Sequence, residues 1–416
     1  MSAGWMLLLD FGTTNTAAAV RSVDGSVRPV RLGSNADQMP SCVFADGDQL
    51  VVGEPAAMRA LAAPDRFEAT PKRRVGEEAV HLGGRDVPVV EIVAAVLRQA
   101  SSRAAAVAGG RAPSHLVLTH PEAWGRVRRD QLAQAAHAAG LSVVTLLPEP
   151  VAAACWYVRG ARVAPGSRVA VFDFGGGTCD VAVLRADPAE ATGFVVEASD
   201  GEDRLGGEHV DRALIEWVGG QLRAEGRAEL ADQLEDPADP GPLLTLRDQV
   251  RAAKHALSEY PDAHVAVGSG RAALSLMITV EEFERLIAPD VDRAVELTRR
   301  VLDAAGCAPA GLAQFYLTGG SSLIPLVGRR LAALLGRAPA TLDDPKLVVA
   351  MGAGYAFEQA PAAAAPPRRV TPPRPVPQRP SPAVPSPPRR GAPVPPPAVA
   401  PPAHWHPNAS PPPYPP

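Results

Sequence analysis

Two segments of this chain, about 160 residues apart, repeat one pattern. Residues 6–20 read MLLLDFGTTNTAAAV, and residues 169–184 read VAVFDFGGGTCDVAVL. Each segment has an apolar run that ends in Asp-Phe-Gly, a turn of small residues that contains Thr, and a second apolar run. Gly and Thr in such a turn leave backbone N–H groups free to face an anion, and an Asp at the end of a buried strand can hold a cation. The repeat therefore predicts a duplicated domain that holds the phosphates of a nucleotide, and its magnesium, from both sides.

The composition excludes several classes of protein. With 416 residues, 46% of them apolar, the chain is long enough for two or three domains with substantial cores. Its net charge is −4, and the residues before 361 carry 35 basic and 45 acidic side chains, so we expect no nucleic acid partner. Cys42, Cys155, Cys179 and Cys307 form no CxxC pair and no metal-ligand spacing, which is typical of a reducing compartment. We see no signal peptide and no run long enough to cross a bilayer, so we expect a cytoplasmic protein without membrane contact.

Short apolar runs alternate with helix-like stretches, which favours an α/β fold with helices covering sheets. Strands are predicted within residues 6–9, 116–119, 169–172, 181–184 and 315–317. Helices are predicted within residues 90–107, 128–139, 210–224 and 280–305. We expect a first lobe over residues 1–164 and a second lobe over residues 165–359, with the turn signal Pro165-Gly166 at their boundary.

The composition changes abruptly near the C-terminus. Residues 361–416 hold 24 of the chain's 45 prolines, six Arg and no acidic residue. Residues 360–416 are therefore predicted to be a disordered or locally polyproline II tail. The tail would be a flexible spacer, or it would bind the aromatic groove of a protein partner through residues 372–375 (PPRP) or 404–416.

The residue types in the two turns suit a metal and a phosphate chain. Asp10 and Asp173 each end the first strand of a hairpin, and Mg²⁺ prefers a few carboxylates together with waters and phosphate oxygens. Either Asp alone would most often cap a turn, but the matched hairpins favour a shared metal. The turns also carry hydroxyls and glycines that allow phosphate oxygens to approach closely, namely Thr13, Thr14, Thr178, Gly12, Gly175, Gly176 and Gly177.

A third turn of small residues follows a predicted strand. Residues 315–325 read FYLTGGSSLIP, and the pair Gly319-Gly320 leaves room for something flat against the backbone. Once the phosphates are placed elsewhere, a base or a ribose is the natural occupant. On its own, this turn is equally consistent with an ordinary helix start.

In this order, the three motifs resemble the phosphate-one, phosphate-two and adenosine motifs of the actin-like ATPases. Four further stretches narrow the resemblance to the nucleotide-binding domain of the seventy-kilodalton heat-shock (DnaK-type) chaperones. They are residues 71–76 (PKRRVG), 148–156 (PEPVAAACW), 205–211 (LGGEHVD) and 349–354 (VAMGAG). The resemblance covers about residues 6–357. It implies two ribonuclease-H-like lobes around a nucleotide cleft, with ATP or ADP and Mg²⁺ as cofactors.

The resemblance also implies roles for individual residues. Asp10, Asp173 and Asp180 would hold magnesium through water. Lys72 would reach the γ-phosphate and orient the attacking water, and Glu149 would complete the polar cage around metal and water. On local grounds alone, Lys72 fits a surface basic run and Glu149 fits a helix cap equally well. The remaining residues of the implied nucleotide site are Gly12, Thr13, Thr14, Asn15, Gly175, Gly176, Gly177, Thr178 (beside the γ-phosphate and counted as catalytic), Gly206, Gly207, Glu208, Lys254, Ser258, Gly319, Gly320 and Ser321.

The implied activity is slow, magnesium-dependent hydrolysis of ATP by in-line attack of water. Catalysis would come from positioning and charge neutralisation. Pro121 and Arg129 match the family's proline switch and arginine relay, which are thought to couple nucleotide state to movement of the lobes.

The chain departs from the family pattern in several places. Leu323, Arg251 and Lys346 stand where relatives usually have Arg, Glu and Asp near the adenosine, so we expect weaker and less selective nucleoside binding. The interval between Lys72 and Pro121 is shorter by about two dozen residues, which predicts a reduced peripheral subdomain and puts exchange-factor partners in doubt. Relatives continue into a β-sandwich that binds peptides, whereas here the Pro-rich tail follows, so we expect no substrate domain.

Four functional classes follow from these observations. The favoured one is a heat-shock-type ATPase whose lobes open and close with nucleotide and pass that motion to a partner. A nucleotide sensor or scaffold that recruits partners through its tail, with little turnover, is the main alternative. A small-molecule kinase of the same superfamily lacks a recognisable acceptor motif here, and a filament-forming actin relative is a fourth possibility.

Overall fold

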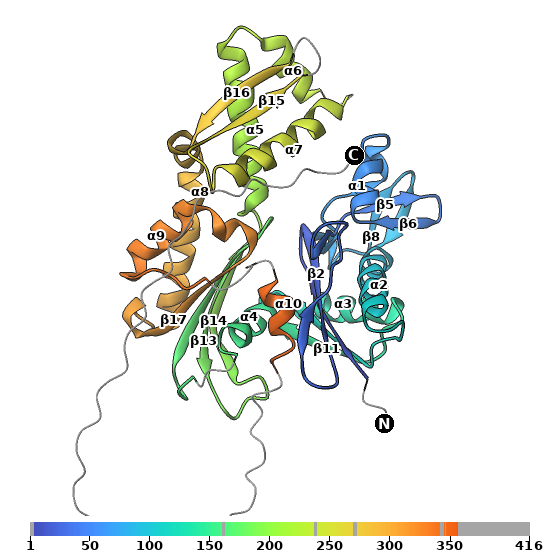
Figure 1. Cartoon of the computed structure of the whole chain (residues 1–416), viewed down its shortest axis with the longest axis vertical. Helices are drawn as coiled ribbons and strands as arrows, with labels where there is room; N and C mark the ends of the chain where they lie inside the picture. Colours follow the sequence, from blue (N-terminus) through green and yellow to red (C-terminus); the bar gives the residue numbers. More distant parts are fainter. Residues whose placement is uncertain are drawn as a thin grey trace, which may run out of the picture. The chain divides into compact units, whose positions relative to one another are not determined.

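The computed structural model describes residues 4–159, 163–236, 239–268, 273–341, 345 and 347–356, which belong to one compact unit. The predicted tail (360–416) and Lys346 lie outside these residues. Two sheets with helices packed against them form most of the described part (Figure 1). Within that part, no helix is both long enough and apolar enough to span a bilayer.

The first sheet has the strand order β11-β10-β1-β2-β3, with β4 paired to β2. Its strands are β1 (Met6–Phe11), β2 (Asn15–Arg21), β3 (Val27–Pro29), β4 (Gln38–Pro40), β10 (His115–His120) and β11 (Val144–Pro148). Side chains of β1 alternate between two cores, as expected for a strand buried on both faces. Leu7 and Leu9 pack with α2 (Val89–Val107) and α3 (Arg126–Ala138), whereas Leu8 packs with α4 (Glu149–Tyr157) and α10 (Val348–Gly352).

The second sheet has the order β14-β13-β12-β17. Its strands are β12 (Arg168–Phe174), β13 (Cys179–Ala186), β14 (Phe194–Glu202) and β17 (Leu312–Thr318). Phe172 and Phe174 of β12 pack with the helices α5 (Gly207–Ala224), α8 (Val280–Ala304) and α9 (Pro325–Leu335). Val169 and Val171, on the other face of β12, belong to the core that contains α4 and α10.

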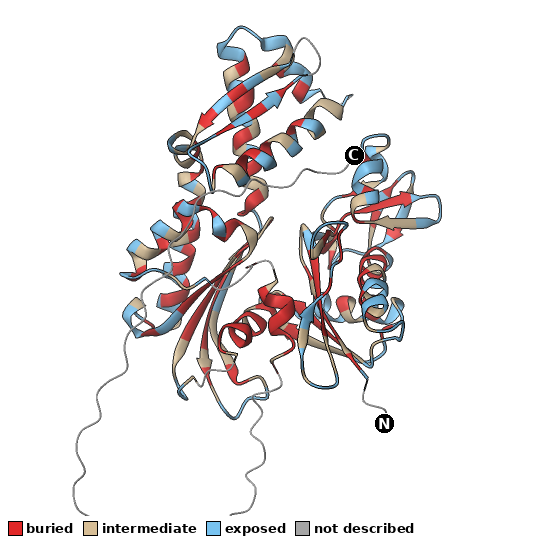
Figure 2. Cartoon of the chain, viewed as in Figure 1, coloured by how far each residue is buried: buried red, intermediate tan, exposed pale blue. Residues whose placement is uncertain are grey.

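Helices α4 and α10 therefore lie between the two sheets and share one core with both (Figures 1 and 2). Every residue of α4 except Pro150 is buried, and all of α10 is buried. Small side chains make this close packing possible, because α4 contains three consecutive alanines and α10 contains Gly352.

The two sheets repeat one arrangement around the two Asp-Phe-Gly strands. In the first sheet, β1 pairs antiparallel with β2 and parallel with β10. In the second, β12 pairs antiparallel with β13 and parallel with β17. The predicted fold is confirmed: the chain is an α/β protein with the two-lobed architecture of actin-like ATPases. We call the first sheet with its helices the first lobe, and the second sheet with its helices the second lobe.

Smaller elements extend each lobe. The first lobe adds β5 (Val43–Asp46), β6 (Gln49–Val52), β7 (Phe67–Glu68), β8 (Ala79–Leu82), β9 (Arg85–Pro88), α1 (Glu54–Ala60) and the 3₁₀ helices η1 (Pro64–Arg66) and η2 (Pro71–Arg74). The second lobe adds α6 (Ala228–Glu235), α7 (Gly241–Ala256), β15 (Asp262–Val267), β16 (Leu274–Thr279), η4 (Pro309–Gly311) and η5 (Gly320–Leu323).

All strands and helices predicted from the sequence are confirmed, and most extend beyond the predicted ranges by one to four residues. The long helix α8 begins at a capping box, in which the Thr279 hydroxyl accepts a hydrogen bond from the Glu282 backbone N–H and the Glu282 carboxylate accepts from the Thr279 backbone. Pro289 lies inside α8 without ending it. The sequence therefore predicted the type of each element correctly but underestimated the length of most of them.

The packing of α10 on α4 gives a test of the fold. A Cβ at Gly352 would overlap the carbonyl oxygen of Ala152, so Gly352→Ala should lower the free energy of unfolding by about 1–3 kcal/mol. Gly328 of α9 has open space where its Cβ would be, so Gly328→Ala should instead raise stability by about 0.5–1 kcal/mol. Urea titrations of both variants measure this, and equal midpoints for Gly352→Ala and the wild type would contradict the close helix crossing.

Candidate functional site

A cavity of about 720 Å³ is lined by the turns of both hairpins. Most residues proposed from the sequence line it, and they come from both lobes. These residues are Asp10, Gly12, Thr13, Thr14, Asn15, Lys72, Glu149, Asp173, Gly175, Gly176, Thr178, Gly207, Glu208, Lys254, Ser258, Gly319, Gly320 and Ser321. The cavity thus collects side chains that lie up to about 310 residues apart in the sequence.

Three proposed residues do not line this cavity. Gly177 contacts the first lobe, where a Cβ would lie 2.5 Å from the Arg73 guanidinium. Gly206 packs on the Gly176 carbonyl at the start of α5. Asp180 lies directly opposite Asp173 in the antiparallel ladder and, together with Asp173, lines a neighbouring hollow.

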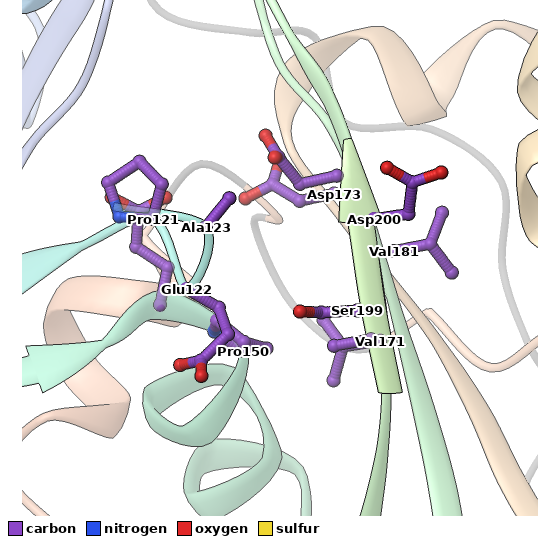
Figure 3. A pocket seen from close by; sticks show the side chains of 12 residues that line it. Pro121, Glu122, Ala123, Pro150, Val171, Asp173, Val181, Ser199 and Asp200 are labelled. Atoms are coloured by element: carbon purple, nitrogen blue, oxygen red, sulfur yellow. The ribbon is translucent and has the colours of Figure 1, made fainter. Parts of the chain in front are cut away.

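That hollow lies between the two lobes and beside the carboxylates (Figure 3). Pro121 and Pro150 of the first lobe face Val171 and Ser199 of the second lobe across it (Figure 3). Its volume of about 20 Å³ is room for roughly one water molecule. Pro121 is therefore placed next to the site, whereas Arg129 is exposed on α3.

Acidic side chains concentrate at the inner end of the cavity. Burial raises the pKa values of Asp10, Asp173 and Asp180 above the usual range, and for Asp173 the charges of Glu149, Asp180 and Asp10 add to the effect of burial. Thr178 partly offsets the effect on Asp180 by a side-chain hydrogen bond. No three acidic, His or Cys side chains in the described ranges are close enough together to ligate a metal ion directly.

Lys72 and Glu149 form a buried ion pair beside these carboxylates. Their Nζ and Oε1 atoms are 2.7 Å apart, and both side chains are about 10% exposed. Burial raises the pKa of Glu149 to about 7, although Lys72 pulls it down. Burial alone would lower the pKa of Lys72, but Glu149 and Asp10 more than offset it, so the pKa is raised and Lys72 stays charged.

Elements with different sequences bring these two residues together. Lys72 lies on η2, whose first residue is Pro71, and Glu149 is the first residue of α4, followed by Pro150. Proline is favoured in the first turn of a helix because the backbone N–H groups there have no intrahelical acceptor, so the N–H that proline lacks is not missed. Pro71 and Pro150 thus favour helix starts at these positions, and the helix starts place the side chains of Lys72 and Glu149.

Close backbone approach explains the glycines of the turns. A Cβ at Gly12 would overlap the carbonyl oxygen of Asn15, which lies across the first turn. Gly319 has φ of 80°, and a Cβ there would overlap both the Asp173 carboxylate and the Phe174 carbonyl. Only glycine fits at these positions, so the third turn packs directly against the second hairpin.

Glu208, in the first turn of α5, connects the second lobe to the first hairpin turn and to η2. Its carboxylate accepts a hydrogen bond from the Thr14 hydroxyl (3.1 Å) and lies 3.2 Å from the Arg73 guanidinium. Arg73 also donates to the Gly177 carbonyl (3.0 Å). We call Thr14, Arg73, Gly177 and Glu208 the bridge, because these residues join the first lobe to the second at the cavity.

Structural neighbours that the sequence analysis missed support several site residues. The buried Thr119 donates to the Asp10 carboxylate (2.9 Å), and Asp211 lies 2.6 Å from the Lys254 ammonium. The Ser321 hydroxyl donates to the Gly175 carbonyl (2.8 Å), which ties the third turn to the second hairpin. Asp211 lies in the LGGEHVD stretch, so the sequence pointed to its neighbourhood as part of the site. Thr119 is a single Thr in an apolar strand, and nothing in the sequence indicates its role.

Comparison with known proteins identifies the family. The family model "Hsp70 protein" matches residues 77–358, more than half of the chain. This chain belongs to the Hsp70 family. Among curated proteins, the "Chaperone protein HscA homolog" of Aeromonas salmonicida is 31% identical over 367 residues, and the "Chaperone protein HscA" of Pectobacterium carotovorum is 32% identical over 369 residues.

Both alignments cover 83% of this Hsp70 chain and 56% of the relative. The chain therefore spans little more than half the length of the curated relatives it matches. The family match begins at residue 77, so the first hairpin turn and Lys72 precede it.

The concentration of carboxylates predicts how stability depends on pH. The folded-state pKa of Asp173 lies well above its ordinary value, so its contribution to stability is greatest at low pH and is lost as the pH rises through the folded-state pKa. Asp173→Asn should therefore stabilise the magnesium- and nucleotide-free protein by about 1–2 kcal/mol at pH 8. This advantage should shrink as the pH is lowered toward 5.

Thermal unfolding of both proteins between pH 5 and 8 measures the difference. Asp203→Asn is the matched control, because Asp203 is an exposed carboxylate nearby, and its effect should stay within about 0.5 kcal/mol. A destabilised Asp173→Asn variant at pH 8 would show that this carboxylate is compensated in the free protein.

Proposed function

We propose that the cavity binds ATP with Mg²⁺ and that the chain hydrolyses ATP slowly, so that its lobes open and close with the nucleotide. One observation carries this proposal. Two glycine- and threonine-containing turns, the carboxylates of Asp10, Glu149 and Asp173, and the buried Lys72 line one cavity between the lobes. Its volume of about 720 Å³ is within the range of cavities that bind small molecules and cofactors.

The turns supply the groups that a phosphate chain needs. Thr13 and Thr14 of the first turn and Thr178 of the second offer hydroxyls to the cavity, and Gly175 and Gly176 allow the phosphate oxygens to approach the backbone. Because the turns belong to different lobes, one nucleotide would contact both. Nucleotide binding would then favour the arrangement in which the lobes are close.

The carboxylates fit a hydrated magnesium ion. Asp10, Asp173 and Asp180 are oxygen donors whose pKa values are raised chiefly by burial, so a cation would offset the cost of burying their charges. Mg²⁺ retains several waters and needs only a few protein carboxylates, so these residues would hold it through water. When bound, the ion would neutralise charge on the phosphates.

Lys72 and Glu149 would act on the attacking water. The charged Lys72 ammonium can hold a water or a terminal phosphate oxygen in place, and its buried position strengthens that interaction. Glu149, with a pKa of about 7, can hold a proton of that water at neutral pH. Thr119 would keep the Asp10 carboxylate oriented toward the cavity.

A role related to chaperones follows from the family. The two relatives are named chaperone proteins, and we propose that this chain likewise passes its lobe movement to a protein partner. The lobe surfaces or the Pro-rich tail would bind that partner. We expect this to take place in the cytoplasm.

Phosphate release by the purified chain tests the proposed activity. Release that requires both ATP and Mg²⁺, without any added acceptor, is the expected result. Release only after addition of a metabolite extract would indicate a kinase, and tight ATP binding without release would indicate the sensor. Sedimentation with ATP would reveal filaments.

Lys72→Ala should separate binding from turnover. The remaining turns still offer their phosphate-binding groups, so ATP affinity should change little. The hydrolysis rate should fall about 10²–10³-fold, because a charged group that positions the reacting atoms is lost. Single-turnover hydrolysis measures the rate, and an unchanged rate would remove Lys72 from the mechanism.

The bridge should slow nucleotide exchange. Arg73 and Glu208 are about one-third exposed, and such ion pairs contribute about 0.2–1 kcal/mol. Arg73→Ala should therefore speed ADP release by about two- to fivefold. Arg74→Ala is the control, since Arg74 pairs with Glu68 inside the first lobe and should leave release unchanged. Equal release rates for the wild type and Arg73→Ala, measured by stopped flow with a fluorescent ADP, would contradict this role.

A further inference from the structure

One face of α7 lines the cavity away from the carboxylates. The cavity is lined there by Arg251, Lys254, His255 and Ser258, which follow the spacing of one helix face. Leu323 of η5, which follows the strand β17, lines the same cavity. If the phosphates lie at the hairpin turns, the nucleoside lies between these elements.

Lys254 is already bound by protein groups. Its ammonium lies 2.6 Å from the Asp211 carboxylate and donates to the Gly207 carbonyl (3.1 Å). The side chain is about 11% exposed, and burial lowers its pKa despite the effect of Asp211. Lys254 thus anchors α7 to the start of α5, and little of its donor capacity remains for a ligand.

Arg251 is held much more loosely. Its Nε lies 4.0 Å from Asp211, at the limit of an ion pair, and Lys254 is the nearer partner of that carboxylate. The Arg251 side chain is 52% exposed although it lines the cavity.

Leu323 offers an apolar surface to the same space. It is 47% exposed, and it is one of only a few large apolar side chains that are exposed in the described ranges. The turn that carries it is fixed by Gly319, whose backbone packs on Asp173 and Phe174, and by the Ser321 bond to Gly175. Leu323 is therefore exposed on a fixed support.

We propose that Arg251 binds the base of the nucleotide, with its guanidinium stacked on one face of the base and Leu323 in contact with another part of the base. This inference rests on the proposed function. A planar guanidinium is suited to stacking on an aromatic ring, whereas an ammonium is a point charge. Arg251 thus supplies the cation–π contact at a position on α7, while the turn at residue 323 supplies only apolar contact.

Two ligands separate a contact with the base from a contact with the phosphates. ATP carries the base, and ribose 5′-triphosphate lacks it but retains the ribose and the phosphate chain. Titration calorimetry with Mg²⁺ gives the dissociation constants of both for the wild type, Arg251→Ala and Arg251→Lys. Arg247→Ala is the matched control, because Arg247 lies one turn earlier on α7, is exposed and does not line the cavity.

Arg251→Ala should weaken ATP binding by about 3- to 10-fold and leave ribose 5′-triphosphate binding unchanged. Arg251→Lys should recover less than half of that loss, and Arg247→Ala should match the wild type. Equal weakening of both ligands would overturn the proposal, since Arg251 would then act on the phosphates. Full recovery by Lys would also overturn it, because charge alone would suffice.

The same titrations distinguish this inference from the proposed function. If the wild type bound neither ligand, the nucleotide site itself would be wrong. If the wild type bound both ligands and Arg251→Ala bound ATP as tightly as the wild type, only the role of Arg251 would fail. Circular dichroism of each variant shows that it is folded, and Arg251 is exposed enough that its replacement should not disturb the core.

Discussion

The concentration of negative charge between the lobes is the constraint on which the rest of this structure depends. Asp10, Asp173, Asp180 and Glu149 are brought together by strand ends and a helix start, and burial raises the pKa of each. Lys72 offsets part of this charge through its contact with Glu149. Such an arrangement costs stability in the free protein. The proposed magnesium ion would offset that cost. The same buried carboxylates therefore affect both the stability of the fold and the chemistry that the site can support.

Much of the fold could be predicted from the sequence, because its signals are local. The Asp-Phe-Gly hairpins, the alternating apolar runs and the amphipathic helices each specify a strand or a helix within a few residues. The two-lobed fold followed from recognising that the hairpin occurs twice. Lengths were underestimated because edge residues such as Arg168 and His115 belong to strands through their pairing, which no apolar pattern shows.

The candidate site was predictable where glycine or a charged residue marks it. Gly12 and Gly319 are needed because another backbone lies within contact distance, so their positions carry information in the sequence. Thr119 carries none, since it is a single Thr in an apolar strand and acts on Asp10 at the other end of a long sequence interval. Arg73 and Asp211 lie in the PKRRVG and LGGEHVD stretches, but their contacts are to other elements and could not be predicted. The antiparallel register places Asp180 directly opposite Asp173, and the proposed role of Asp180 as a magnesium ligand through water stays a prediction. The exact nucleotide and metal contacts remain predictions.

The core shared by α4, α10 and both sheets has a mechanical consequence. Neither lobe can move away from the other as a whole without exposing this core to water, which would cost the burial of many apolar side chains. Rotation about the two helices would cost less, because α4 and α10 could stay packed on each other at the close contact between Ala152 and Gly352. A few degrees of rotation at this pivot would be amplified into the largest displacement at elements far from it, such as the β15–β16 hairpin. A small change at the proposed phosphate site would then produce a larger displacement at the ends of the lobes.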